Sequence, residues 1–314
     1  MMIWKLGALG PTAQSSGFKK PKFSSSSDTM TFPNFNEIVF FLAFGLSSLA
    51  NAYPLLPELT SPFSLGITSF ELINYATSRC LMVSIFCPAA DPGNCKQYLL
   101  SLDISPPFAQ IVSEQYCSPF QSIANLTARA HLNVPMKSPS FPVIFYSPGY
   151  GGSHLEYTCT VGDIASLGYI DVAIDHLDDT FFIEYLNGTV AIYDPVDYDN
   201  TTVYVPFVNN HVSDIRFALD SFSNDSFASQ IPGFSSFTTQ GRYKGNDGFD
   251  TNHIGVLGHS LGGASEASTM LADPHFVTGI NIDGSMIGSV ASVGLSSPFI
   301  LVSSAVHNRS TDPS

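Results

Sequence analysis

The feature of this sequence that most restricts its fold is a short segment, Gly258-His-Ser-Leu-Gly-Gly263, set between two regular elements. An apolar, β-branched run at residues 253–257 precedes it and predicts a buried strand. Residues 260–271 follow and are rich in helix formers. A strand that turns at once into a helix needs small residues around the turn, because neighbouring backbone passes close by. The segment therefore predicts a strand–turn–helix unit that holds Ser260 clear of the edge of a sheet.

Short apolar runs recur along the chain, and each is typical of a strand covered on both faces. Besides 253–257, they lie at residues 80–87, 141–146, 169–174, 277–282 and 298–302. Helical patterns lie between several of them, at residues 154–167, 211–222 and 260–271. Strands that alternate with helices predict the α/β class, with a mostly parallel central sheet, right-handed crossovers and helices on both faces.

The 314 residues suffice for one large α/β domain. We expect residues 1–52 to be an N-terminal extension with a signal peptide, and residues 53–314 to be the α/β domain with an insertion at 177–251. The insertion is rich in Asp, Asn, Ser and aromatic residues and joins two predicted strands. Long connections at the carboxyl ends of parallel strands usually shape a site. The alternative is a glycosylated surface insertion with no part in a site.

The charge balance excludes several classes of partner. The chain has 12 Lys and Arg against 26 Asp and Glu, a net charge of −14. Such a field repels nucleic-acid backbones and anionic lipid surfaces. We therefore expect no nucleic-acid partner and a neutral or zwitterionic small molecule or lipid as the substrate.

The N-terminal region points to export. Residues 38–50 form an apolar run of 13 residues, too short to span a bilayer but suited to a signal-peptide core. Ala50-Asn51-Ala52 follows as a small-residue cleavage site; the alternative is a buried helix. Glycosylation sequons agree with a secreted, N-glycosylated protein without a stable membrane span, and they begin at Asn125, Asn187, Asn200, Asn224 and Asn308.

The cysteines predict no metal site, because the chain has no Cys-x-x-Cys pair and no Cys/His cluster with zinc spacing. No cofactor is expected. In an oxidising compartment we expect one or two disulfides among the cysteines from Cys80 to Cys117, with one thiol left over. The alternative is that all five are buried small hydrophobic residues.

The turn at Ser260 predicts a nucleophile. Its place at a helix N-terminus lets backbone N–H groups and the helix dipole stabilise a developing oxyanion. A second donor is expected from the loop after the strand at 141–146, in Ser147-Pro-Gly-Tyr-Gly-Gly152. By position the donors are the backbone N–H groups of Tyr150 and Leu261. A phosphate-binding loop is the competing interpretation, but no Lys follows the glycines in the required register.

The acid that orients a general base must follow the nucleophile in this type of chain. After Ser260 the carboxylates are Glu266, Asp273, Asp283 and Asp312. Glu266 and Asp273 lie on or just after the predicted helix and point away from the turn. Asp283 ends a predicted strand and precedes a glycine, as a residue at the carboxyl edge of a sheet should. We therefore predict Asp283 as the acid.

Four segments carry a specific resemblance to a known family. They are Pro142-Val-Ile-Phe-Tyr-Ser-Pro-Gly-Tyr-Gly151, residues 164–176, Gly258-His-Ser-Leu-Gly-Gly263 and Gly279-Ile-Asn-Ile-Asp-Gly284. Over residues 79–304 the chain resembles the platelet-activating-factor acetylhydrolase family of α/β-hydrolases. The resemblance implies the α/β-hydrolase fold and calcium-independent hydrolysis of short or oxidised sn-2 acyl esters of glycerophospholipids. It also implies that Asp283 is the triad acid. Pro148 departs from the His that many members carry in this loop, and residues 177–251 show little that matches.

The histidine of the triad is the open point. It should follow one further strand, and the candidates after Ser260 are His275 and His307. His176 and His259 are expected to be structural. We expect the final strand, the histidine loop and the last helix of the fold to lie beyond Ser314. His307 is the residue within the chain that could replace the missing base.

Three functions remain open. The first is a serine esterase acting on lipids like platelet-activating factor. A secreted polyester or cutin-type carboxylesterase is the second, because its Ser-Pro-Gly-Tyr and Gly-His-Ser-x-Gly-Gly segments are similar. An inactive binding protein on the same fold is the third, because the catalytic histidine is not evident.

Overall fold

The computed structural model describes residues 54–90, 97–116, 119–193, 204–234, 249 and 254–305. The chain divides into two compact units, of which the first comprises Met1–Pro54 and Ser105–Leu126. Its described part holds helices α2 (Pro106–Tyr116) and α3 (Phe120–Ile123). The second unit comprises Leu55–Ile104 and Thr127–Ser314 and carries the sheet. The predicted signal peptide lies outside the described residues.

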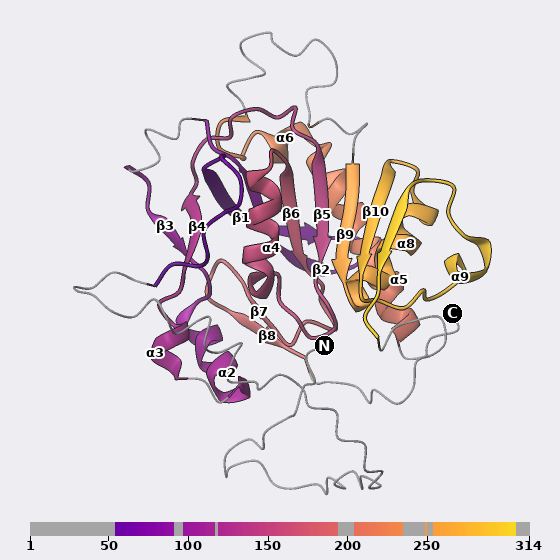
Figure 1. The fold of residues 1–314 in the computed structure, drawn as a ribbon, viewed down its shortest axis with the longest axis horizontal. Coiled ribbons are helices and arrows are strands. Elements are labelled where there is room, and N and C mark those ends of the chain that lie inside the picture. Colours follow the sequence, from indigo (N-terminus) through magenta and orange to yellow (C-terminus); the bar gives the residue numbers. More distant parts are fainter. Residues whose placement is uncertain are drawn as a thin grey trace, which may run out of the picture. The chain divides into compact units, whose positions relative to one another are not determined.

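Nine strands of the second unit form one sheet in the order β11-β10-β9-β5-β6-β2-β1-β4-β3 (Figure 1). The five strands from β11 to β6 are parallel, β2 is antiparallel to β6, and β1 is antiparallel to β2. Their bounds are β1 Leu65–Asn74, β2 Arg79–Pro88, β3 Leu100–Leu102, β4 Thr127–Leu132, β5 Val143–Ser147, β6 Ile170–Asp175, β9 Ile254–His259, β10 Phe276–Ile282 and β11 Phe299–Val302.

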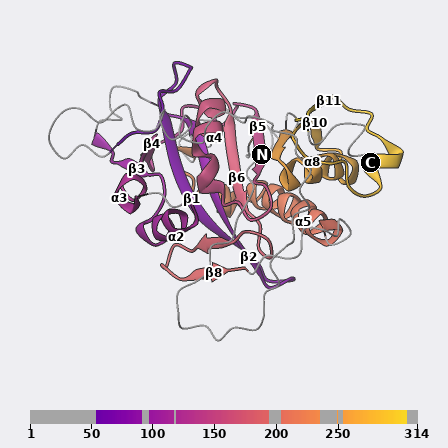
Figure 2. The same cartoon turned by 60° about the horizontal axis from the view of Figure 1, so that its bottom comes forward.

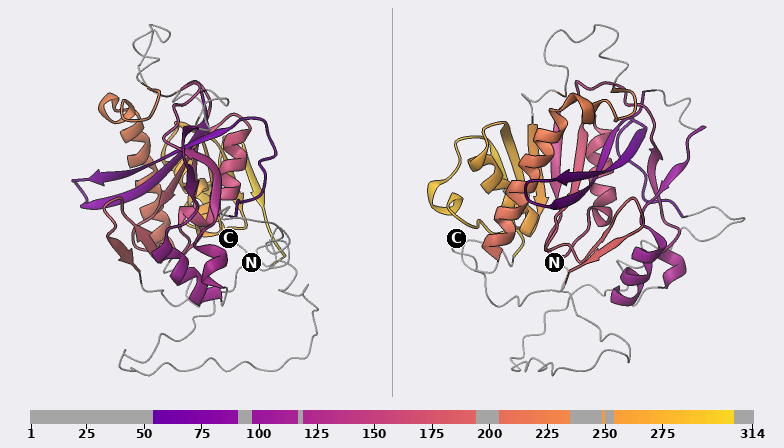
Figure 3. Two further views of the ribbon diagram at one scale, coloured as in Figure 1. Left: turned by 90° about the vertical axis from the view of Figure 1, so that its left-hand side faces the viewer. Right: turned by 180° about the vertical axis from the view of Figure 1, so that it is seen from behind.

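The path of the chain places helices on both faces. From β5 it passes through α4 (Thr158–Ser166) to β6, and then through α5 (Tyr204–Phe222) back past β5 to β9. Because both crossovers are right-handed, this reversal of direction puts α4 and α5 on opposite faces. Figure 1 shows α4 in front of the sheet, and Figure 3 shows α5 on the other face. The reversal occurs at β5, so a ligand site is expected at the carboxyl ends of β5 and β9.

The core lies between the sheet and α5, where side chains of both are almost fully buried. Phe145 on β5 is its centre: its ring lies 5.8 Å from that of Phe222 on α5 and 5.9 Å from that of Phe276 on β10. Each such buried side chain stabilises the fold by about 1.5–3 kcal/mol. Helix α5 also packs against α8 (Leu261–Ala272), as Figure 2 shows. The core therefore fixes α8 relative to β5.

The predicted strands and helices of the α/β pattern are confirmed, and the structure adds elements that were not predicted, among them β1, β3, β4, α2 and α3. Helix α5 begins at Tyr204, because the 3.6-residue apolar pattern continues through Phe207 and Val208, which are buried. The strand β1 was not predicted, because its sequence mixes polar and apolar residues and its turn to β2 has no Asn-Gly signal. The segment 177–251 also holds a small hairpin, β7 (Phe182–Glu184) with β8 (Val190–Ile192), and a short helix α6 (Asp225–Ala228).

The expected disulfides are wrong for two of the cysteines. Cys80, Cys87 and Cys159 are free thiols. Cys87 is buried within β2, and burial raises the pKa of its thiol to about 12, so it behaves as a small hydrophobic residue. Cys95 and Cys117 lie outside the described residues. Within the described part of the chain, no helix is long and apolar enough to cross a bilayer.

Candidate active site

Ser260 occupies the sharp turn between β9 and α8. Its φ is 53° and its ψ is −117°, a conformation that is strained for a residue with a Cβ atom. The Ser260 N–H donates to Ile282 O at 2.8 Å, which ties the turn to the neighbouring strand. A Cβ atom on Gly262 would lie 2.1 Å from Ser147 O, so only glycine lets α8 approach the end of β5 this closely. The predicted strand–turn–helix unit is present.

The loop at residues 148–152 lies against this turn. A Cβ atom on Gly149 would be 3.2 Å from the Cβ of Ser260. The Gly149 N–H donates to the Tyr157 hydroxyl at 3.2 Å, and that hydroxyl is 2.9 Å from His259 Nδ1. Burial raises the pKa of Tyr157 to about 12, so the phenol keeps its proton and can donate it to His259. Tyr157 therefore links the loop to the strand that carries Ser260.

The structure brings Tyr150 and Leu261, the predicted oxyanion donors, into one cluster. Both are buried in one apolar cluster with Phe207 and Val208 of α5. The Tyr150 ring lies 5.6 Å from that of Phe207 and 5.8 Å from that of Tyr204. The amides of Gly149 and Gly152 donate within the loop, to the Tyr157 hydroxyl and to Gly149 O. These two amides are therefore engaged within the loop.

Asp283 follows β10 directly beside the turn at Ser260. Its φ is 59°, a second strained non-glycine residue at this edge of the sheet. Its N–H donates to Val302 O at 2.7 Å, and its Oδ1 accepts from the Ser304 N–H at 2.7 Å. The Asn281 side chain, which sequence reasoning missed, accepts from Gly284 N–H at 2.7 Å and donates to Gly284 O at 3.0 Å. These bonds fix the turn that presents the Asp283 carboxylate.

The other two carboxylates near α8 lie on or just after this helix, and Glu266 faces the Ser147 side chain at the end of β5. Glu266 is completely buried within α8, and burial raises the pKa of its carboxyl well above the ordinary value. Asp273 follows the end of α8 and contacts His275 Nδ1 at 2.7 Å and Arg216 Nε at 3.1 Å. Partial burial opposes ionisation of Asp273, but hydrogen bonds from His275 and Arg216 outweigh it and lower its pKa.

His275 is excluded as the base by its position. It precedes Phe276, the first residue of β10, which pairs with Ile254 at the start of the parallel strand β9. Ser260 follows the end of β9, so His275 and Ser260 lie at opposite edges of the sheet. The other histidines that the structure describes are His131, His154, His176, His211 and His259, and each has a bonding partner other than Asp283. His253 and His307 lie outside the described residues.

Sequence reasoning missed two buried groups of polar residues that resemble a triad. In one, His176 lies 3.1 Å from both Ser147 Oγ and Asp214 Oδ2. In the other, His154 lies 2.8 Å from both Ser84 Oγ and Asp175 Oδ2. All of these residues are buried, so no ester could reach Ser147 or Ser84. Among the described residues, no three His, Cys, Asp or Glu side chains are arranged to hold a metal ion.

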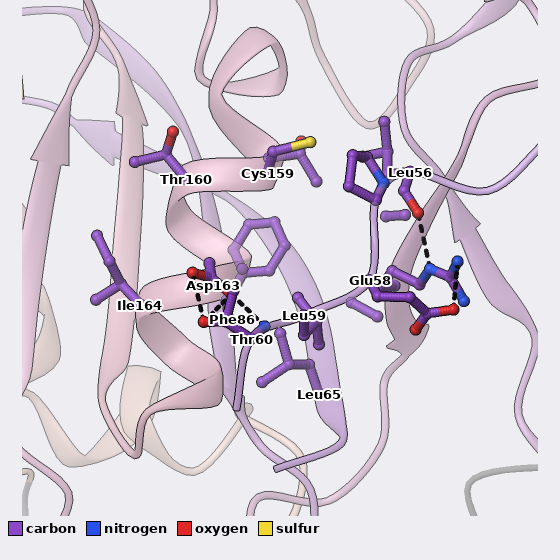
Figure 4. A pocket seen from close by; sticks show the side chains of 16 residues that line it. Leu56, Glu58, Leu59, Thr60, Leu65, Phe86, Cys159, Thr160, Asp163 and Ile164 are labelled. Atoms are coloured by element: carbon purple, nitrogen blue, oxygen red, sulfur yellow. Dashed lines mark hydrogen bonds and ion pairs between the residues drawn. The ribbon is translucent and has the colours of Figure 1, made fainter. Parts of the chain in front are cut away.

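A cavity of about 440 Å³ lies on the α4 side of the sheet (Figure 4). Leu56, Leu59, Leu65 and Phe86 supply apolar walls, and Cys159 on α4 lines it as well. None of the residues of the Ser260 turn or of the 148–152 loop lines this cavity. The cavity is therefore separate from the candidate active site.

Comparisons with known proteins show which family this chain resembles and which fold it has. The family described as platelet-activating factor acetylhydrolase, isoform II, matches residues 54–204. A protein of Arthroderma benhamiae named as a probable 1-alkyl-2-acetylglycerophosphocholine esterase is 28% identical over 298 residues, which cover 85% of this chain and 70% of that protein. A ferulic acid esterase from Streptomyces cinnamoneus is similar in structure with a TM-score of 0.64, at 24% identity over 80% of this chain and 68% of its own. The structural match confirms the predicted fold, that of the α/β-hydrolases.

Proposed function

We propose that this chain, a relative of the platelet-activating factor acetylhydrolases with the α/β-hydrolase fold, is a carboxylic ester hydrolase with Ser260 as its nucleophile. One observation carries the proposal. Ser260 is held in a strained turn at the start of α8, in contact with the 148–152 loop and beside Asp283. Nucleophile, oxyanion donors and acid thereby meet at the switch point of the sheet.

In the proposed reaction the Ser260 hydroxyl oxygen attacks the ester carbonyl carbon while a histidine takes its proton. The backbone N–H groups of Tyr150 and Leu261 stabilise the negative charge that develops on the carbonyl oxygen. The intermediate then collapses: the bond to the alcohol oxygen breaks, and the alcohol leaves with the proton from the histidine. Water repeats the sequence on the acyl-serine and releases the carboxylic acid.

Asp283 orients the histidine in this scheme. Its Oδ1 accepts from the Ser304 N–H and its backbone has a positive φ, which together fix the direction of the carboxylate. His275 lies at the opposite edge of the sheet and His259 Nδ1 faces the Tyr157 hydroxyl, so we assign the base to a histidine that the structure does not describe.

For the substrate we propose the short sn-2 acyl ester of a glycerophospholipid like platelet-activating factor. The named activity of the fungal relative supports this choice. The net charge of −14 supports a zwitterionic lipid over an anionic one. The aromatic wall of Tyr150, Tyr204 and Phe207 offers apolar surface beside Ser260.

A panel of esters tests the proposal, with the Ser260→Ala variant as the blank. The panel holds a soluble short-chain phosphocholine ester, its long-chain counterpart and a polyester film. We expect turnover of the first, much less of the second and none of the film. Preference for the film would favour a cutin-type esterase. Binding of the phosphocholine ester without turnover would favour an inactive binding protein.

We also propose that the protein is exported and N-glycosylated. Asn187 and Asn224 are exposed to solvent, as acceptors of a glycan must be. Mass spectrometry of the native protein should find an N-terminus near residue 53 and glycans on these asparagines. An intact N-terminus at Met1 or Met30 would contradict export.

A further inference from the structure

The 148–152 loop is held at both of its ends by buried polar groups that cannot touch a substrate. Ser147 precedes the loop, and Ser153 and His154 follow it. Each of these three side chains is almost fully buried and bonded. Each of them has a partner in one of two consecutive residues, Asp175 at the end of β6 and the following His176.

Asp175 holds the far end of the loop. Its Oδ1 accepts from the backbone N–H of His154 at 2.6 Å and from the Ser153 hydroxyl at 3.1 Å. Its Oδ2 contacts His154 Nδ1 at 2.8 Å. The hydrogen bonds from the Ser153 hydroxyl and the His154 N–H to this carboxylate fix the point at which the loop enters η2 (His154–Tyr157).

His176 holds the near end. Arg79 donates to both oxygens of Asp214 at 2.8 Å, which keeps this carboxylate ionised. Asp214 can therefore only accept, so the proton of His176 lies on Nδ1, 3.1 Å away. The Nε2 atom of His176 is then an acceptor, and it receives the hydroxyl proton of Ser147 at 3.1 Å.

Because Asp175 and His176 are consecutive, their side chains can hold the two ends of the 148–152 loop from opposite faces of the sheet. Consecutive side chains at the end of a strand point to opposite faces of the sheet. Asp175 faces the side of η2, whereas His176 stacks on His211 of α5, with ring centres 3.6 Å apart. The loop therefore bridges the edge of the sheet between a fixed point on one face and a fixed point on the other.

We propose that Asp175 and His176 are positioning residues that set the distance of the Tyr150 amide from the ester carbonyl oxygen. The proposal rests on the proposed function, because it assigns a purpose to the placement of the 148–152 loop. An oxyanion donor acts only within about 0.3 Å of its best distance, so a loop held at both ends stabilises the transition state more than the bound ester.

The test uses Ser147→Ala and Ser153→Ala, which remove one bond at each end of the loop without adding volume. We expect each to lower kcat on the order of 10–100-fold and to change KM less than threefold, because a donor displaced by about 1 Å costs about 10²-fold. Asp273→Asn is the matched control: it breaks a similar Asp–His contact at the opposite edge of the sheet and should leave both constants unchanged.

Hydrogen–deuterium exchange of the loop peptide is measured on the same variants and needs no turnover. We expect the amides of residues 148–152 to exchange faster than in the wild type in both serine variants. In Asp273→Asn their exchange rate should equal that of the wild type. The double variant should cost little more in kcat than the worse single one, because either release frees the same loop. Unchanged exchange, or a rise in KM equal to the loss of kcat, would overturn the proposal. Turnover that persists in Ser260→Ala would instead overturn the proposed function, and the exchange data would still decide the role of the two ends.

Discussion

Two regions of the sheet differ in what they offer a ligand. The α4 side has a cavity of about 440 Å³, whose lining combines apolar side chains with charged residues such as Glu58 and Asp163 (Figure 4). The carboxyl edge at β5, β9 and β10 has a tightly packed turn, a loop fixed at both ends and two strained residues, Ser260 and Asp283. The cavity therefore lies on the α4 side, whereas Ser260 and Asp283 lie at the carboxyl edge. The proposed chemistry therefore lies at the carboxyl edge of the sheet, and this cavity has no part in it.

The sharpest test of this contrast removes one side chain from each region. Ser260→Ala should lower ester turnover on the order of 10⁴–10⁶-fold, because the nucleophile is lost. Cys159→Ala removes an exposed thiol that lines the cavity and should leave turnover within twofold. Rates are measured with a short-chain phosphocholine ester. A larger loss in Cys159→Ala than in Ser260→Ala would reverse the assignment of the two regions.

The next largest effect is expected for Asp283. Asp283→Asn should cost on the order of 10⁴ in kcat, because the histidine would lose the carboxylate that orients it and stabilises its charge. The fold should survive, since an Asn side chain can still accept from the Ser304 N–H. A loss below tenfold in a folded variant, judged by its thermal unfolding, would place the acid elsewhere.

Replacing a glycine by alanine should have opposite effects on the stability of the fold in the two regions. Gly262→Ala would place a Cβ atom 2.1 Å from Ser147 O and 2.4 Å from Pro148 O, so it should destabilise the fold by about 1–3 kcal/mol or more. Gly162→Ala on α4 would make ordinary contacts at 3.6 Å with Leu65 and 3.7 Å with Leu59. It should stabilise the fold by about 1 kcal/mol, since alanine favours a helix and adds contacts at the cavity. Urea unfolding measures both; equal effects of the two changes would contradict the contrast in packing.

The smallest effect concerns the buried Glu266. Burial raises the pKa of its carboxyl in the folded state, whereas in the unfolded chain it ionises near its ordinary value of 4.5. Above that pH the unfolded state gains stability by losing the proton, so Glu266 destabilises the fold increasingly as pH rises. Glu266→Gln should therefore gain stability relative to the wild type between pH 4 and pH 8. A difference in urea midpoint that does not change with pH would show that Glu266 is ionised in the fold.

The parts that could be predicted from sequence are those with local signals. Apolar runs gave β5, β6, β9, β10 and β11 because buried parallel strands need them on both faces. The glycines around Ser260 gave the turn, and the glycine after Asp283 gave the end of β10.

The parts that could not be predicted depend on contacts between distant residues. Asp175 and His176 meet Ser153 and Ser147 only after β6 has paired with β5. Asp214 contacts His176 only because α5 packs across the sheet. No sequence pattern in the insertion at 177–251 predicts this contact. Cys80 and Cys87 lie at opposite ends of a single strand, so their proximity in sequence did not make them partners for a disulfide.

A fluorophosphonate label followed by peptide mapping tests most directly whether the turn at Ser260 is the ester-cleaving site. We expect a single adduct, on the peptide that contains Ser260, and no adduct on the Ser260→Ala variant. An adduct on a different residue, or ester turnover by a chain in which Ser260 stays unlabelled, would contradict this assignment.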